Sequence, residues 1–360
     1  MGMFGLRKKT EMESEIYEQP DILADILENE GVDAITVPEN VAKIVIVASG
    51  SSYHCARFSA ELLGEIAGIE ARAMYSSEFL VKKVVPHDKG TLYIFITQSG
   101  ETSDTVNALR YVNNGFLDEN NEKYYLETLC ITNNPNSEIW KESKYHINCR
   151  AGEEKSIAAT KSFTAQMLCV LTVALKIAKN KGYDTDAYIA SLKNLPDVLH
   201  RTFAIRPKIK QLAHLIAKQK IVVILAEGIS YAIAKEGALK IKETSYININ
   251  AALIGEFMHG HLAVLNKNAS VIYLSVDGVS TSAADNLEKI KKEYNPSIYI
   301  IGKHNKCISN FNVTVDCENE ILQMFSNAVI CQLLALEIAT LLHRNIDKPK
   351  GLKKVVKPDV

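Results

Sequence analysis

The chain has 360 residues, a length that predicts about two domains rather than one. Hydrophobic residues make up 47% of the sequence and charged residues 23%, a composition typical of a soluble globular protein with a sizeable core. The formal net charge of −1 offers no basic surface for nucleic acid, no apolar run reaches the roughly 18 residues of a membrane span, and the polar first 20 residues do not resemble a signal peptide.

The seven cysteines are scattered along the chain and include no CxxC pair. This spacing indicates reduced thiols in the core, not a disulfide framework or a zinc site. The cytoplasm is therefore the expected location. The sequence shows no cluster of metal ligands, so no metal is expected. No organic cofactor is expected either.

Two strand–turn–helix segments in the first half carry the first sign of a binding site. An apolar run at residues 45–48 predicts a buried strand, and a Gly-Ser turn at residues 50–52 leads from it into a helix. A second apolar run, at residues 92–96, predicts a parallel strand followed by a helix from Asp104. The intervening turn, TQSGET at residues 97–102, is rich in hydroxyls and has no lysine or arginine. Such a turn binds a phosphate monoester or simply caps its helix, and the turn alone does not separate these two interpretations.

The remaining predicted elements alternate in the same way. Residues 113–123 form a polar surface insertion, which is followed by a strand over residues 125–132 and a core helix over residues 162–180. The junction between the halves is expected at residues 195–207, where Arg206 and Pro207 follow an apolar stretch. The second half has strands at residues 223–226 and 271–276, a helix over residues 321–342 and a lysine-rich tail over residues 345–360.

The second half repeats the first at an offset of 178 residues. At this offset VIVASGSSY (residues 45–53) aligns with VILAEGISY (residues 223–231), so that Gly50 meets Gly228. A period this long indicates duplicated domains. Because each copy alternates buried strands with helices, the sequence predicts an α/β fold with a doubly wound parallel sheet in each half and ligands at the carboxyl ends of the strands.

Together these motifs resemble the sugar isomerase (SIS) superfamily. More narrowly, nearly the whole chain is similar to the isomerase half of glucosamine-6-phosphate synthases (glutamine:fructose-6-phosphate amidotransferases). The matching segments, in chain order, are EIYEQP at residues 15–20, AATKSFTAQ at 158–166, EGALKIKE at 236–243, GEFMHG at 255–260 and DKPKGLKKV at 347–355.

The resemblance implies two tandem SIS domains, each a three-layer αβα unit. The expected parts are an N-terminal helical segment (residues 1–30), a phosphate-binding first domain (31–200), a second domain with the catalytic helix and loop (201–344), and a tail that closes over the active site (345–360).

Aldose–ketose interconversion needs a proton shuttle between C1 and C2 and a nearby cation to steady the developing negative charge. Glu243 and Lys240 lie three residues apart on one helical face, a spacing that on an arbitrary helix is a surface salt bridge. By resemblance, Glu243 is the base and Lys240 its cationic helper. His259 is expected to open the sugar ring from the other subunit of a homodimer. Lys354 is expected to form a Schiff base with the keto sugar, while Lys353 remains solvated.

The resemblance also supplies a set of phosphate-binding residues, namely Gly50, Ser51, Ser52, Thr97, Gln98, Ser99 and Thr102. Glu101 is expected to cap a helix N-terminus and not to act as a catalyst. Two positions depart from the family pattern. Ala159 stands where serine is usual, and His261 stands where proline usually follows the His-Gly pair. Both departures bear on the choice of substrate.

The expected function is the interconversion of a keto-hexose phosphate (fructose 6-phosphate-like) and an amino-hexose phosphate (glucosamine 6-phosphate-like). Only about a dozen residues precede the matching segments and no cysteine precedes Cys55, so no glutaminase nucleophile is expected. Ammonia would come from solution or from a separate glutaminase subunit. The same site run in reverse is a deaminase. The alternatives are an isomerase or deglycase for another sugar phosphate and, less favoured, a non-catalytic sugar-phosphate sensor.

Overall fold

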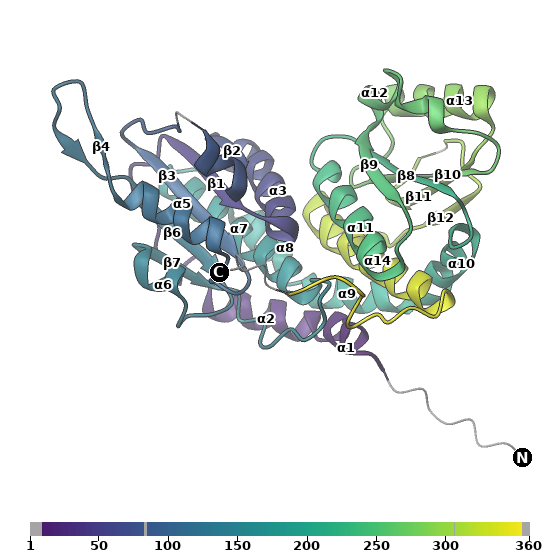
Figure 1. Ribbon diagram of the computed structural model, residues 1–360, viewed down its shortest axis with the longest axis horizontal. Coiled ribbons are helices and arrows are strands. Elements are labelled where there is room, and N and C mark those ends of the chain that lie inside the picture. Colours follow the sequence, from purple (N-terminus) through teal and green to yellow (C-terminus); the bar gives the residue numbers. More distant parts are fainter. Residues whose placement is uncertain (1–8, 83–84, 306, 355–360) are drawn as a thin grey trace, which may run out of the picture.

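Two parallel five-stranded sheets, each flanked by helices, form two units that lie side by side in the computed structural model (Figure 1). The structure describes residues 9–82, 85–305 and 307–354. Residues 355–360, which belong to the predicted tail and include the last residue of the final matching segment, lie outside the described residues. The predicted α/β fold with a doubly wound parallel sheet in each half is confirmed.

The first unit follows two N-terminal helices, α1 (Glu11–Tyr17) and α2 (Gln19–Asn29). Its sheet has the order β2-β1-β3-β6-β7 and is built from β1 (Lys43–Ala48), β2 (Glu70–Tyr75), β3 (Thr91–Thr97), β6 (Glu127–Thr132) and β7 (Tyr145–Asn148). Its helices are α3 (Gly50–Ala67), α4 (Ser76–Val81), α5 (Ser103–Asn113), α6 (Glu138–Glu142) and α7 (Lys161–Asn180). The predicted insertion contains an antiparallel hairpin of β4 (Phe116–Leu117) and β5 (Lys123–Tyr124).

Three helices lead into the second unit, α8 (Asp186–Leu192), α9 (Leu195–Ala204) and α10 (Arg206–Ile216). The stretch expected as the junction is therefore helical. Its prolines occupy the first turns of α9 and α10, where the missing N–H costs no hydrogen bond.

The second sheet has the order β12-β11-β10-β8-β9. Its strands are β8 (Ile221–Ala226), β9 (Ile249–Leu253), β10 (Ala269–Ser275), β11 (Ser297–Gly302) and β12 (Phe311–Val313). Its helices are α11 (Ser230–Ser245), α12 (Ile254–Phe257), the 3-10 turn η1 (His261–Val264), α13 (Thr281–Tyr294) and α14 (Glu320–Leu341). The strand order is the same as in the first unit, which supports the internal repeat.

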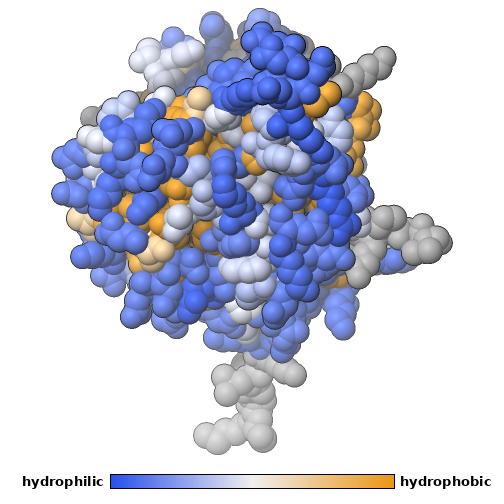
Figure 2. Space-filling model, turned by 90° about the vertical axis from the view of Figure 1, so that its left-hand side faces the viewer, coloured by the Kyte–Doolittle hydropathy of each residue, from blue (hydrophilic) through white to orange (hydrophobic). Residues whose placement is uncertain are grey.

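One apolar core joins the two units. Along β1, Ile44 and Ile46 face this common core, whereas the alternate residues Val45 and Val47 face an outer cluster that belongs to the first unit alone. Ile224 on β8 faces the same common core from the second unit. The exterior of the first unit seen in Figure 2 is mostly hydrophilic, with hydrophobic residues in narrow gaps. Because residues of both sheets pack in this common core, the packing and not a linker fixes how the two sheets lie relative to each other.

Helices α7 and α14 run through this common core and are buried along most of their length. By length and composition each could cross a membrane, although scattered charged residues interrupt their apolar runs. In the folded chain, however, 94% and 89% of their most apolar windows are buried inside the protein. These are the properties of core helices surrounded by other elements.

Helices α11 and α14 approach closely at Gly237, where an added Cβ would lie 2.8 Å from Sγ of Cys331. We expect Gly237→Ala to lower the free energy of unfolding by about 1–3 kcal/mol, because the two helices would have to move apart. The matched control is Gly64→Ala on α3, where the nearest atom is the carbonyl oxygen of Ile69 at 3.9 Å. There we expect no loss, or a gain of up to about 1 kcal/mol. Denaturant titration followed by circular dichroism measures both; equal losses would contradict the close-packing argument.

Candidate active site

A cavity of about 550 Å³ lies at the carboxyl ends of β1 and β3. Segments of the first unit, helix α11 of the second unit and the C-terminal tail all contribute to its wall. The lining includes every residue predicted to bind phosphate, namely Gly50, Ser51, Ser52, Thr97, Gln98, Ser99 and Thr102. It also includes Lys240, Glu243 and Lys354. Folding therefore brings the predicted phosphate turn and three of the four predicted catalytic residues to one place.

The two turns at the strand ends present neutral donors to the cavity. Helices α3 and α5 both begin there, and the side chains of their N-cap residues, Ser49 and Thr102, make no hydrogen bond to their own helices. The hydroxyl of Thr102 instead lies 2.9 Å from that of Thr97. Helix N-termini attract anions through their unpaired N–H groups and the positive end of the dipole. The arrangement suits a phosphate held without a fixed positive charge.

Glu101 caps a helix, as expected, but the helix is α6. Its Oε1 accepts a hydrogen bond of 3.1 Å from the backbone N–H of Glu138, the first residue of α6. Glu101 is not among the residues that line the cavity. A carboxylate is thus held away from the place where a phosphate would bind.

Lys240 is a deeply buried charge in the cavity wall, with 1% of its side chain exposed. Its Nζ lies 2.6 Å from Oε2 of Glu243 and donates a hydrogen bond of 3.1 Å to Oγ of Ser51 on α3. Burial by itself lowers the pKa of Lys240, but the carboxylates of Glu236 and Glu243 outweigh it, so the pKa lies above its ordinary value. Lys240 therefore stays an ammonium beside Glu243, and the pair faces the cavity instead of forming a surface salt bridge.

Two buried residues behind Lys240 were missed by the sequence analysis. Glu236 lies one helical turn before Lys240, with 3.3 Å between Oε1 and Nζ, and its Oε2 is 2.7 Å from Nδ1 of His54 on α3. Burial raises the pKa of Glu236, but Lys240 and His54 outweigh this effect and lower that pKa to about 2. The spacing of four residues between Glu236 and Lys240 was a signal that could have revealed the first of these contacts.

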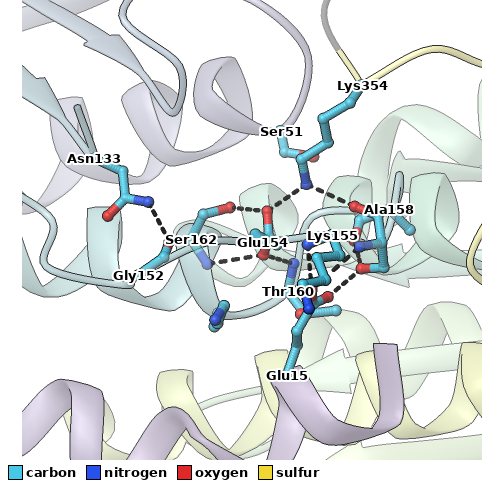
Figure 3. Close-up of polar contacts among 12 residues, drawn as sticks. Glu15, Ser51, Asn133, Gly152, Glu154, Lys155, Ala158, Thr160, Ser162 and Lys354 are labelled. Carbon is cyan, nitrogen blue, oxygen red and sulfur yellow. Dashed lines mark hydrogen bonds and ion pairs between the residues drawn. The ribbon is translucent and has the colours of Figure 1, made fainter. Parts of the chain in front are cut away.

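Lys354 reaches the cavity from the tail (Figure 3). Its Nζ lies 2.5 Å from Oε2 of Glu154 and donates a hydrogen bond of 2.8 Å to the carbonyl oxygen of Ser156, both in the loop between β7 and α7. Its neighbour Lys353 also lines the cavity although it is exposed. The sequence analysis did not single out Glu154, which occurs four residues before a matching segment.

His259 is not among the residues that line this cavity. It is exposed in the turn after α12, which lies at the far end of the second unit (Figure 1). The imidazole ring of His261, at the position where the family usually has proline, stacks on the Phe257 ring at a centroid distance of 6.3 Å. A His259 side chain could therefore reach such a cavity only from another copy of the chain or after a large rearrangement, and its role stays a prediction.

The corresponding crevice in the second unit is smaller and has a different lining. Its lining contains four carboxylates, from Glu65, Glu227, Asp277 and Glu320, in a volume of about 260 Å³. In the repeat, Asp277 occupies the position of Ser99. The crevice of the second unit also contains hydroxyl donors such as Ser230 and Ser280, but its four carboxylates repel a phosphate.

Among the residues that the structure describes, no group of three or more His, Cys, Asp or Glu side chains could hold a metal ion. All seven cysteines are free thiols. Five are buried, but Cys307 and Cys317 are partly exposed, so the expectation that all seven belong to the core is wrong for these two.

The family model of the SIS domain matches two segments of the chain, residues 39–176 and 215–342. The chain belongs to the SIS domain family. The glutamine–fructose-6-phosphate aminotransferase of Neisseria meningitidis is 32% identical over 96% of this chain, and the chain spans about 58% of that relative's length. The solved C-terminal domain of glucosamine-fructose-6-phosphate aminotransferase from Francisella tularensis is 27% identical, with a TM-score of 0.87 over 95% of this chain and 99% of that one.

The fold is shared with more distant proteins. A glucosamine-6-phosphate deaminase from Thermotoga maritima superposes with a TM-score of 0.76 over 96% of this SIS chain and 99% of its own, at 22% identity. At that identity the likeness concerns the fold alone.

The buried pair of Glu236 and Lys240 makes stability depend on pH. Since the pKa of Glu236 falls from its ordinary 4.5 to about 2, its ionised form stabilises the fold above pH 4.5, and this contribution is lost as the pH falls toward 2. We expect Glu236→Gln to cost about 3–5 kcal/mol of unfolding free energy at pH 7, because Lys240 loses a buried partner. The difference from the native protein should shrink below pH 4.5.

Denaturant titrations at pH 7, 4 and 2.5 measure this difference. Glu288→Gln, an exposed change on α13, is the control and should stay within about 0.5 kcal/mol of the native protein. A cost for Glu236→Gln that is the same at all three pH values would contradict the assigned ionisation.

Proposed function

We propose that this SIS protein is an isomerase/aminase that interconverts a fructose 6-phosphate-like ketose and a glucosamine 6-phosphate-like amino sugar. The observation that carries the proposal is one cavity that combines neutral phosphate donors, the Lys240–Glu243 pair and the tail lysine. The names of the curated relatives support it, since they describe aminotransferases that act on fructose 6-phosphate.

Each group has a defined part in the proposed reaction. The turn that begins at Thr97 and the N-terminus of α5 bind the phosphate and place the open-chain sugar along the cavity. The amine of Lys354 condenses with the C2 carbonyl, whose oxygen leaves as water. Ammonia then adds to C2 of this imine, and the bond from C2 to the Lys354 nitrogen breaks to release the lysine amine. Glu243 then moves the proton between C1 and C2, while the ammonium of Lys240 offsets negative charge that develops on the intermediate.

The reaction needs ammonia and is reversible. Ammonia comes from solution or from a separate glutaminase subunit, and the same groups run the reaction backwards as a deaminase. The protein acts in the cytoplasm as a homodimer whose composite site receives His259 from the partner copy.

A second candidate rests on Ala159, which lines the cavity at a position where the family resemblance leads one to expect serine. The loss of that hydroxyl removes one hydrogen-bond donor to the sugar. This favours, as the alternative, an isomerase or deglycase for a different sugar phosphate.

Two assays test the proposed reaction. Glucosamine 6-phosphate should release ammonia, and fructose 6-phosphate with ammonium should yield glucosamine 6-phosphate. We expect Glu243→Gln and Lys354→Ala to lower turnover at least about 100-fold, because each removes a group from the reacting atoms. Lys350→Ala changes an exposed tail lysine outside the cavity lining; it is the matched control and should change turnover by less than about threefold. Absence of turnover of both sugars by the native protein would reject the proposal.

The composite site is tested by subunit mixing. Glu243→Gln and His259→Ala are each expected to be inactive as homodimers. A mixed dimer holds one site with both defects and one with neither, so statistical exchange should restore about a quarter of native activity. Subunit exchange is followed by native mass spectrometry. Confirmed exchange without recovered activity would show that His259 does not act across an interface.

A further inference from the structure

The carboxylate of Glu154 is fully buried and all of its hydrogen-bond partners are donors. Its Oε1 accepts from the backbone N–H groups of Thr160 and Ser162, at 2.9 and 3.1 Å. Its Oε2 accepts from Oγ of Ser162 at 2.7 Å and faces Nζ of Lys354 at 2.5 Å (Figure 3). Oε1 is thus held by backbone N–H groups at the start of α7. Oε2 is shared between the Ser162 hydroxyl and the tail lysine.

The loop that carries Glu154 is itself fixed in place. Glu15 on α1 accepts hydrogen bonds from the backbone N–H groups of Lys155 and Ser156 and from the Ser156 hydroxyl. The nearby ammonium of Lys161 pairs with Glu18 at 2.6 Å and leaves Glu154 to the tail. A carboxylate positioned in this way cannot follow a moving partner, so it defines where the Lys354 nitrogen rests.

We propose that Glu154 is the fixed counter-ion of Lys354, both as the free ammonium and as the protonated imine. The inference rests on the Schiff base of the proposed function. In that step a C2–N double bond replaces the C2–O double bond, and two ammonium hydrogens leave with the carbonyl oxygen as water. Between these two charged forms the ammonium gives up one proton, the neutral amine attacks C2, and the nitrogen regains its positive charge when the carbinolamine loses its hydroxyl as water. The buried carboxylate stabilises the charged nitrogen at the start and at the end of the step, and it lies where it can take up the proton that the ammonium loses.

Glu154→Gln removes the charge of Glu154 while it keeps the size of the side chain and the two contacts with backbone N–H groups. In Glu154→Gln, an amide oxygen in the place of Oε1 still accepts from Thr160 and Ser162, whereas the amide NH₂ replaces the oxygen that faces Lys354. The native protein and the variant are mixed with fructose 6-phosphate and borohydride, and mass spectrometry follows the reduced adduct on Lys354. We expect the rate of adduct formation to fall at least about tenfold in the variant, as for loss of a charged hydrogen bond.

Two further variants separate charge from structure. Glu153→Gln changes the exposed neighbouring carboxylate and should leave the trapping rate within about twofold of the native protein. Glu154→Asp keeps the negative charge on a shorter side chain and should trap faster than Glu154→Gln. A trapping rate for Glu154→Asp at or below that of Glu154→Gln would contradict a role based on charge.

A measurement without sugar tests the resting ion pair separately. Acetic anhydride should modify Lys354 more slowly than Lys353 in the native protein, and the two lysines should react alike in Glu154→Gln. An adduct that forms equally fast in the native protein and in Glu154→Gln overturns the role of Glu154 and leaves the proposed function intact. If no adduct forms on the native protein, the Schiff base is rejected, and the role of Glu154 as counter-ion of the imine is rejected with it. This holds even if acetylation shows that Glu154 and Lys354 are paired in the absence of sugar.

Discussion

The buried ammonium of Lys240 is the interaction on which the geometry of the cavity depends. It comes from α11 of the second unit, and its partners are Glu236 and Glu243 on the same helix and Ser51 on α3 of the first unit. A charge with 1% exposure is tolerated only when its partners are in place, because an uncompensated buried charge costs several kcal/mol. His54 extends the network across the same boundary through Glu236. The two units therefore pack in the one arrangement that closes the cavity.

Duplication followed by divergence explains why one chain has one such cavity. In both units a glycine in the left-handed region lies at the start of the helix that follows the first strand, with φ of +58° at Gly50 and +47° at Gly228. The backbone of the turn is thus retained in each copy. The side chains differ, since the first unit presents hydroxyls and the second presents carboxylates such as Asp277. The first copy is suited to a phosphate, while the second contributes the charged helix α11.

The tail completes the cavity through contacts that precede Lys354. The carboxylate of Asp347 accepts hydrogen bonds from the first two N–H groups of α1, both at 3.0 Å, and its carbonyl oxygen accepts one from Ile157. The N–H of Lys350 donates a hydrogen bond of 2.6 Å to the hydroxyl of Tyr246 at the end of α11. The tail is thus fastened to the N-terminal helix, the first unit and the second unit before it reaches Glu154. A lysine-rich segment that composition alone would leave solvated becomes part of the wall.

A phosphate at the turn after β3 and a catalytic role for Lys240 and Glu243 came from the family resemblance, and both stay predictions. Local patterns were enough to predict the two parallel sheets, the hydroxyl-rich turn before a helix and the shared helical face of Lys240 and Glu243. Each of these depends on residues close together in the chain, where hydrophobic periodicity and helical spacing are direct consequences of backbone geometry. Such patterns did not predict which residues pair with the buried charges. Lys354 meets Glu154 across 200 residues and His54 meets Glu236 across 182, so no periodicity links them. Those contacts exist because two sheets share one core and a tail folds back over it, which is a property of the packed chain and not of any segment.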